Sequence, residues 1–171
     1  MKDEGMLRIS GIVGDSIVDG PGLRMSIFTQ GCPHHCPGCH NPDTHDPAGG
    51  RWISREEILG QLRGNPLQAG VTLSGGEPFE QAEALIPLCR EIRRMGKNIW
   101  IYSGYTFEQL LEGAVPFGQE LMGLCDVLVD GRFILAERDL TLLFRGSRNQ
   151  RVVDLPASLS EGKAVLLSLE D

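Results

Sequence analysis

The chain has 171 residues, of which 41% are hydrophobic and 23% are charged, as expected for a single domain that spans residues 1–171 around one core. The formal net charge of −7 argues against nucleic-acid binding, which normally requires a basic face. The first residues lack the apolar core of a signal peptide and no apolar run is long enough to cross a bilayer, so we expect a cytoplasmic protein without membrane contact.

The hydrophobic pattern predicts strands that alternate with helices. In chain order, strands are expected at residues 24–29, 71–73, 98–103, 126–130, 151–155 and 164–169. Helices are expected after the capping boxes that begin at Ser54 and Thr106, and over residues 82–95, where Gly96 is the expected stop. Strands alternating with helices are typical of βαβ units, so the pattern predicts an α/β fold around a mainly parallel sheet.

Three of the five cysteines lie within eight residues, directly after the first of these strands. Cys32, Cys36 and Cys39 have the spacing C-x3-C-x2-C, and clustered thiols in a reducing compartment indicate metal ligands rather than disulfides. A closed zinc site takes four ligands and a cubane iron–sulfur cluster normally takes four cysteines. Three thiolates therefore leave one metal position open, which points to chemistry rather than to a purely structural site.

The spacing also leaves a zinc site open as an alternative. A histidine nitrogen can complete a zinc tetrahedron, and the neighbouring candidates are His34, His35 and His40. The two remaining cysteines are far away in the sequence. Cys89 falls on the apolar face of a predicted helix and Cys125 opens a predicted strand, so both are expected in the core.

A second motif, Ser74-Gly-Gly-Glu-Pro78, follows the predicted strand at residues 71–73. Two consecutive glycines allow a backbone to approach a ligand closely, because no Cβ intervenes. Glu77 adds a carboxylate that suits an ammonium group. The alternative is an ordinary turn between a strand and a helix that begins near Pro78. In parallel sheets ligands bind at the carboxyl ends of strands, so this turn and the cysteine loop are expected to share one site.

Together, the two motifs resemble the radical S-adenosylmethionine (SAM) superfamily. Its C-x3-C-x2-C loop follows the first strand of a partial (β/α) barrel, and its Gly-Gly-Glu-Pro-type motif follows the second strand. Both motifs occur here in that order, at residues 32–39 and 75–78. The resemblance implies a partial (β/α) barrel of mainly parallel strands. Gly38 departs from the many members that place an aromatic residue before the last cysteine.

Within this superfamily the sequence is similar to the activases of glycyl-radical enzymes. Ser16–Arg24 resembles their amino-terminal signature, and the similarity continues to Leu155. Anaerobic ribonucleoside-triphosphate reductase activating proteins resemble the chain most, in Cys36–Cys39, Leu73–Gly76, Ile99–Tyr105, Asp126–Phe133 and Phe144–Ser147 with Asn149-Gln150. His40 departs from the tyrosine expected there. Cys-His-Asn is more typical of pyruvate formate-lyase activases, so that lyase or another glycyl-radical enzyme is the alternative target.

This resemblance implies a [4Fe–4S] cluster on Cys32, Cys36 and Cys39, with a fourth iron that chelates SAM through its amino and carboxylate groups. One electron from the reduced cluster would cleave SAM to methionine and a 5′-deoxyadenosyl radical. That radical would take a hydrogen atom from a glycine Cα of the partner, the large subunit of the reductase. Reduced flavodoxin or ferredoxin is the implied electron donor.

The resemblance also implies which residues contact SAM: Gly38, Cys39, His40, Gly75, Gly76 and Glu77, with Glu77 near the ammonium group. Residues 102–104 are expected to border the nucleoside, and residues 19–24 to line the partner's glycine loop. For Asp130 the sequence leaves open a contact with the cofactor, a contact with the partner or an ordinary solvated strand end. For Arg145 it leaves open a contact with the partner or a sharp turn. His45 lies in a loop rich in Pro and Gly and is expected to be solvated.

Overall fold

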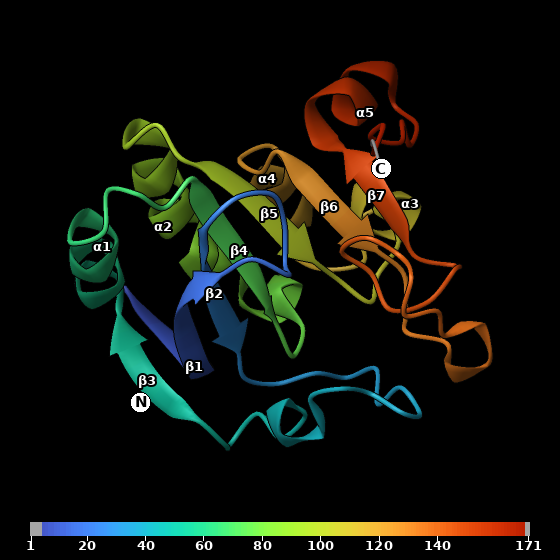
Figure 1. The fold of residues 1–171 in the computed structure, drawn as a ribbon, viewed down its shortest axis with the longest axis horizontal. Helices are drawn as coiled ribbons and strands as arrows, with labels where there is room; N and C mark the ends of the chain where they lie inside the picture. Colours follow the sequence, from blue (N-terminus) through green and yellow to red (C-terminus); the bar gives the residue numbers. More distant parts are fainter. Residues whose placement is uncertain (1–4, 170–171) are drawn as a thin grey trace.

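The computed structural model describes residues 5–169. They contain a seven-stranded mixed sheet with the strand order β3-β1-β2-β4-β5-β6-β7 (Figure 1). The strands are β1 (Met6–Ser16), β2 (Arg24–Thr29), β3 (Arg51–Ser54), β4 (Gly70–Gly75), β5 (Asn98–Tyr102), β6 (Val127–Asp130) and β7 (Arg151–Asp154).

The sheet is parallel only in its centre. The pairs β2–β4, β4–β5 and β5–β6 are parallel, whereas β1–β2, β1–β3 and β6–β7 are antiparallel. The expected mainly parallel order therefore holds for the four central strands and not for the whole sheet. The expected partial barrel is not confirmed. The structure shows a mixed sheet with β3 and β7 at its edges.

Residues 5–169 also contain five α-helices and three short 3₁₀ helices. They are α1 (Arg55–Arg63), α2 (Ala82–Arg94), α3 (Phe107–Leu111), α4 (Gly118–Met122), α5 (Leu155–Glu161), η1 (Pro42–Thr44), η2 (Pro78–Gln81) and η3 (Leu135–Glu137). Ser54 and Thr106 begin α1 and α3 as expected, since each side chain accepts a backbone hydrogen bond three residues later. None of the helices described within residues 5–169 has the length and apolar character needed to span a bilayer.

The alternation of side chains along the central strands gives the sheet two different faces. Met25, Leu73 and Ile101 belong to the main core, which also contains apolar residues of α1, α2, α3 and α4. The opposite face contains the row Ser26, Thr72, Trp100 and Val127, paired strand by strand. This face is polar at β2 and β4 and apolar at β5, β6 and β7, where Trp100 packs in a second cluster.

Several elements differ from the sequence prediction. β1, β3, α4 and α5 were not expected. β1 contains Gly11 and Gly14 and is exposed over much of its length, so it lacks a clear period-2 apolar pattern. The strand expected at 151–155 ends at Asp154, whose side chain caps α5 by accepting from the backbone N of Ala157 at 3.1 Å. The segment expected as a strand at 164–169 makes one bridge, from Leu166 to Val153.

Candidate functional site

The carboxyl ends of the central parallel strands meet two long loops around a cavity of about 380 Å³. One loop, residues 30–50, follows β2, and the other, residues 131–150, follows β6; in Figure 1 both extend beyond the arrowheads of the central strands. The wall also includes Val18 and Asp19 from the segment between β1 and β2. Segments that are distant in the sequence therefore meet at the carboxyl ends of the parallel strands, where α/β proteins bind ligands.

Cys32, Cys36 and Cys39 all line this cavity. Each is half-buried and none forms a disulfide. The loop that carries them is held at its start, because Gly31 N donates to Thr44 O at 2.6 Å and Cys32 N donates to His45 O at 3.1 Å. Burial raises the pKa of the Cys32 thiol and the nearby charge of Glu77 adds to this rise, while backbone hydrogen bonds oppose it.

The thiol donor set around the cavity is compatible with an iron–sulfur cluster. One zinc ion requires its ligands to converge within about 2.3 Å of one point, and residues 5–169 contain no group of three or more His, Cys, Asp or Glu side chains so arranged. In a cubane cluster each cysteine binds a different iron, so the sulfurs need not converge. Three thiols around one cavity are a suitable donor set for a cluster with one open iron.

Gly75 and Gly76 also line the cavity, and they bring β4 directly against the cysteine loop. Gly75 has a φ of 101°, and a Cβ on it would lie 2.5 Å from Thr29 N. A Cβ on Gly76 would lie 2.4 Å from Gly31 O. Glycine is therefore required at both positions by close backbone packing within the protein. A ligand that approached this backbone would require it as well.

Glu77 is fully buried and does not line the cavity. Its Oε1 accepts from Ser103 Oγ and Gly104 N, both at 2.8 Å, and its Oε2 accepts from Phe79 N at 3.0 Å. With a hydrogen on Nε2, His34 donates to the same Oε1 at 2.7 Å. The sequence placed the Glu77 carboxylate beside the ammonium group of a ligand. In the structure, its hydrogen bonds come from donors within the protein.

The Glu77 contacts connect the cysteine loop to the ends of β4 and β5. The His34 side chain is 4% exposed, and its ring packs edge-on against Tyr105 with centroids 4.7 Å apart. A Cβ on Gly104 would lie 2.4 Å from His34 Cδ2, so Gly104 leaves the space that this ring fills. His34, one of the alternative zinc ligands, therefore has a role in positioning the loop.

Gly38 and His40 flank the last cysteine but differ in placement. Gly38 does not line the cavity; its φ is 74°, and a Cβ on it would lie 2.9 Å from Leu135 Cδ1. His40 is exposed and lines the cavity, with its ring centroid 5.0 Å from that of Phe133. Among the expected SAM-contacting residues, Cys39, His40, Gly75 and Gly76 lie at the cavity wall, whereas Gly38 and Glu77 do not.

Tyr102, Ser103 and Gly104 line the cavity at the end of β5, as expected for residues bordering a ligand. Two further residues lie at the wall without a ligand role having been assigned to them from the sequence. His45, expected to be solvated, is half-buried at the wall with its Nε2 buried and unpaired. Arg145 also lines the wall. It belongs to the segment Phe144–Ser147, which resembles the activating proteins, but that resemblance assigns it no ligand. No local pattern reveals either one, because loop contacts across the sequence place them here.

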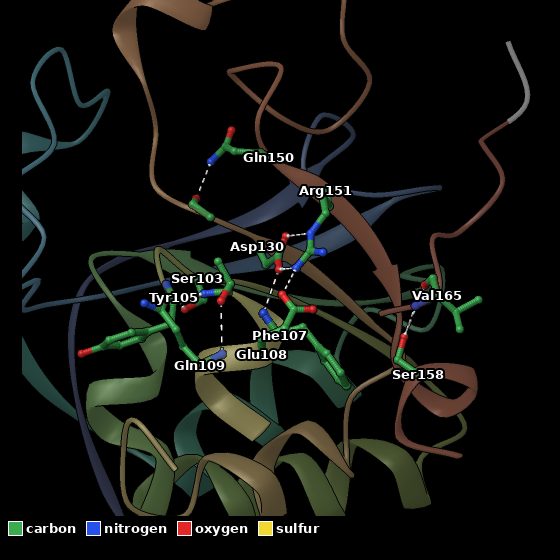
Figure 2. A network of polar contacts seen from close by, with 12 residues as sticks. Ser103, Tyr105, Phe107, Glu108, Gln109, Asp130, Gln150, Arg151, Ser158 and Val165 are labelled. Atoms are coloured by element: carbon green, nitrogen blue, oxygen red, sulfur yellow. Dashed lines mark hydrogen bonds and ion pairs between the residues drawn. The ribbon is translucent and has the colours of Figure 1, made fainter. Parts of the chain in front are cut away.

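Asp130 and Arg24 are structural residues. Asp130 is 1% exposed and accepts from Arg151 Nε at 3.0 Å and Phe107 N at 2.8 Å, which joins β6 to β7 and α3 (Figure 2). Arg24 is fully buried and donates to Thr72 Oγ1 at 2.8 Å and Val71 O at 3.0 Å. Burial lowers the pKa of Arg24 to about 10. Arg24 therefore does not line a partner-binding surface in this structure.

Comparisons with known proteins find iron–sulfur and reductase-activating relatives. Residues 18–153 match the family model described as a 4Fe-4S single cluster domain. The chain is 35% identical over 144 residues to the anaerobic ribonucleoside-triphosphate reductase-activating protein of Escherichia coli (strain K12), covering 80% of this chain and 91% of that protein. The proteins of the same name from Vibrio cholerae and Enterobacteria phage T4 are 36% and 33% identical, over 78% and 79% of this chain and 89% and 86% of theirs.

Among solved structures, the chain is similar to the crystal structure of QueE from Escherichia coli. The TM-score is 0.47 at 22% sequence identity, and the superposition covers 59% of this chain and 53% of that chain.

Proposed function

Since the chain belongs to the family of anaerobic ribonucleoside-triphosphate reductase-activating proteins and to the 4Fe-4S single cluster domain family, we propose that it is a radical SAM activase. In this proposal, it uses a [4Fe–4S] cluster and SAM to generate a glycyl radical on anaerobic ribonucleoside-triphosphate reductase. The observation that carries the proposal is the meeting of Cys32, Cys36 and Cys39 with Gly75 and Gly76 around one cavity.

In this proposal the three cysteine thiolates hold the cluster, and SAM lies along the end of β4. Gly75 and Gly76 present backbone without side chains to the methionine part, and His40 lies beside Cys39 at the wall. When bound, the reduced cluster supplies one electron for cleavage of SAM to methionine and a 5′-deoxyadenosyl radical, which takes a hydrogen atom from a glycine Cα. Gly38 and Glu77 contribute to cofactor binding by holding the two loops in place.

Part of the remaining cavity wall is apolar. Phe28, Phe133, Leu142 and Phe144 give the cavity aromatic and aliphatic walls. A radical that abstracts hydrogen must be shielded from solvent and from other side chains, and apolar walls provide this shielding. The glycine of the partner suits the reaction because its Cα carries no side chain that would block approach.

The test begins with anaerobic reconstitution and metal analysis. We expect about four irons with matching sulfide per chain, and methionine release when SAM and a strong reductant are added. The reduced protein is then mixed with the reductase large subunit, and the glycyl radical is recorded by EPR, with reduced flavodoxin or ferredoxin as alternative donors. One zinc per chain without iron, or a loaded cluster that never releases methionine, contradicts the proposal.

A second target is retained because of one observation. The sequence Cys39-His-Asn41 is more typical of pyruvate formate-lyase activases, and His40 lies at the cavity wall. Parallel incubations with pyruvate formate-lyase and with the reductase separate the two targets. A glycyl-radical signal on the lyase alone would replace the reductase as partner without changing the chemistry.

A further inference from the structure

The cavity wall contains an arginine with unused hydrogen-bonding capacity. Arg145 lines the cavity, and its Nε is buried without a hydrogen-bond partner. None of the ion pairs between residues 5–169 includes Arg145. A buried guanidinium donor without a partner costs free energy, so its retention at a cavity wall points to a ligand that supplies the acceptor.

The loop that carries Arg145 is fixed on both sides. Before it, Phe144 adopts a φ of 61°, and its carbonyl oxygen accepts from Tyr102 Oη at 2.5 Å. After it, Gly146 N donates to Gln150 Oε1 at 2.9 Å. A positive φ on a phenylalanine is strained and persists only where the surroundings enforce it. The fixed loop therefore holds the Arg145 backbone in place at the cavity wall.

This loop also reaches the cysteine loop. A Cβ on Gly146 would lie 3.4 Å from His40 Cε1, and 3.2 Å from Phe133 Cδ1. His40 follows Cys39 directly. The residue next to Arg145 is thus packed close to His40, which follows a proposed cluster ligand, so the two loops are in contact beside the cavity that Arg145 lines.

The charges around the cavity favour an anionic group at Arg145. The two acidic residues at the wall have partners of their own: Asp19 Oδ2 accepts from Ser16 Oγ at 3.0 Å and Ser26 Oγ at 2.9 Å, and Asp139 Oδ1 accepts from Thr141 N at 2.9 Å. Arg132 also lines the wall, but it is exposed to solvent, whereas Arg145 is half-buried. A half-buried guanidinium binds a carboxylate oxygen well, because hydrogen bonds between two charged groups are stronger than those between neutral groups.

We propose that Arg145 binds the carboxylate of the methionine part of SAM; this inference rests on the proposed function. Chelation of an open iron through the amino nitrogen and one carboxylate oxygen leaves the second oxygen in need of a donor. Arg145 supplies that donor and fixes the orientation of the amino-acid end. Arg145 is therefore a binding residue for the cofactor rather than a contact for the partner protein.

The test compares two ligands on the reconstituted protein: SAM and decarboxylated SAM, which lacks only the carboxylate. Dissociation constants are measured anaerobically for the wild type, Arg145→Gln, Arg145→Lys and the control Arg148→Gln, after iron content shows equal cluster loading. Arg148 is exposed, three residues away and outside the cavity wall. We expect Arg145→Gln to weaken SAM binding about 10- to 100-fold and to change binding of the decarboxylated ligand less than about 3-fold.

Arg145→Lys is expected to recover part of the loss, because it restores the charge without the planar fork, and Arg148→Gln is expected to bind both ligands like the wild type. Equal weakening of both ligands by Arg145→Gln, or no weakening of either, overturns the assignment while leaving the proposed function intact. A fully loaded wild type that does not bind SAM overturns both. If Arg145→Gln does not load a cluster, the comparison is made with Arg145→Lys, where a loss confined to SAM is expected and an equal loss for both ligands overturns the assignment.

Discussion

At the scale of residues, hydrogen-bond partners inside the protein decide which polar side chains near the cavity remain available to a ligand. Glu77 accepts four hydrogen bonds from within the chain, whereas Arg145 Nε has no partner. The side chain type suggested a ligand contact for Glu77 and left the role of Arg145 open. The structure distinguishes the two, because burial makes an unpaired donor expensive and a fully paired carboxylate stable.

Cys36→Ala is predicted to abolish SAM cleavage and leave the fold intact. Cys36 is half-buried in a loop, so loss of its thiol removes a cluster ligand and little packing. Iron content and methionine release after reconstitution check this prediction, with Cys89→Ala as a control. Cys89 is fully buried in α2, so that variant should keep its iron and lose about 1 kcal/mol of unfolding free energy. Unimpaired methionine release by Cys36→Ala would refute the ligand assignment.

Glu77→Gln is predicted to lower the free energy of unfolding by about 1–3 kcal/mol. The amide NH₂ of glutamine would replace one of the two carboxylate oxygens, and it would then face either Phe79 N or Ser103 Oγ, which are both donors. Urea titration of the protein measures the change. The control is Glu80→Gln, three residues away and exposed, whose amide oxygen can still accept from Tyr105 Oη as the carboxylate does. For this control a change below about 0.5 kcal/mol is expected. Equal effects of the two substitutions would show that the Glu77 contacts do not stabilise the fold.

At the scale of elements, the end of β4 and the start of the cysteine loop behave as one unit. Gly76 N donates to Thr29 O at 2.9 Å and Glu77 N donates to Gly31 O at 2.8 Å. These hydrogen bonds extend the parallel pairing of β2 with β4 beyond the two strands. They join the turn after β4 to the start of the cysteine loop. A change in the turn after β4 must therefore move the loop that carries the cysteines.

Gly76→Ala is predicted to weaken SAM binding and to lower the free energy of unfolding by about 1–3 kcal/mol. The added Cβ would lie 2.4 Å from Gly31 O, so the turn and the cysteine loop must separate. Dissociation constants for SAM and thermal unfolding measure the two effects. Gly60→Ala is the matched control, since its Cβ in α1 would meet no atom within 4 Å and alanine favours a helix. Normal affinity and stability for Gly76→Ala would contradict the close backbone packing.

At the scale of the whole molecule, the central strands form a rigid base. The loops at residues 30–50 and 131–150 extend from the carboxyl ends of these strands. β4 and β5 are flanked by strands on both sides, and their apolar residues are buried in the main core. The loops at the cavity are connected to this base by a few hydrogen bonds, such as those of Gly31 and Glu77. Local opening should therefore be rare in the sheet and frequent in the loops.

Amide hydrogen exchange tests this description. We expect the slowest exchange in β4 and β5, and faster exchange at residues 31–50. Loading the cluster should slow exchange at residues 31–41 and, through the Glu77 contacts with His34 and Gly104, at residues 75–77 and 103–105. α5 lies outside these contacts and serves as the internal control. Uniform slowing that includes α5, or no slowing at residues 31–41, would contradict the proposed coupling.

The sequence predicted the central part of the fold well and its margins poorly. Strands at 24–29, 98–103 and 126–130 correspond to β2, β5 and β6, because each is a compact buried run with clear ends. β3 is only four residues long and half exposed, and α4 begins after Phe117 in a left-handed conformation with a φ of 63°. Such elements depend on their neighbours in space, so local patterns do not identify them.

By itself, the sequence indicated the family and its iron–sulfur cofactor, since three thiols at fixed short spacing and a Gly-Gly turn after a strand are local features. Only the tertiary structure decided which residues meet at the cavity. His34 and Glu77 are 43 positions apart and Tyr102 and Phe144 are 42 apart, yet each pair is joined by a hydrogen bond. The physical reason is that long-range pairings depend on the order and direction of the strands, which the local pattern of side chains does not specify.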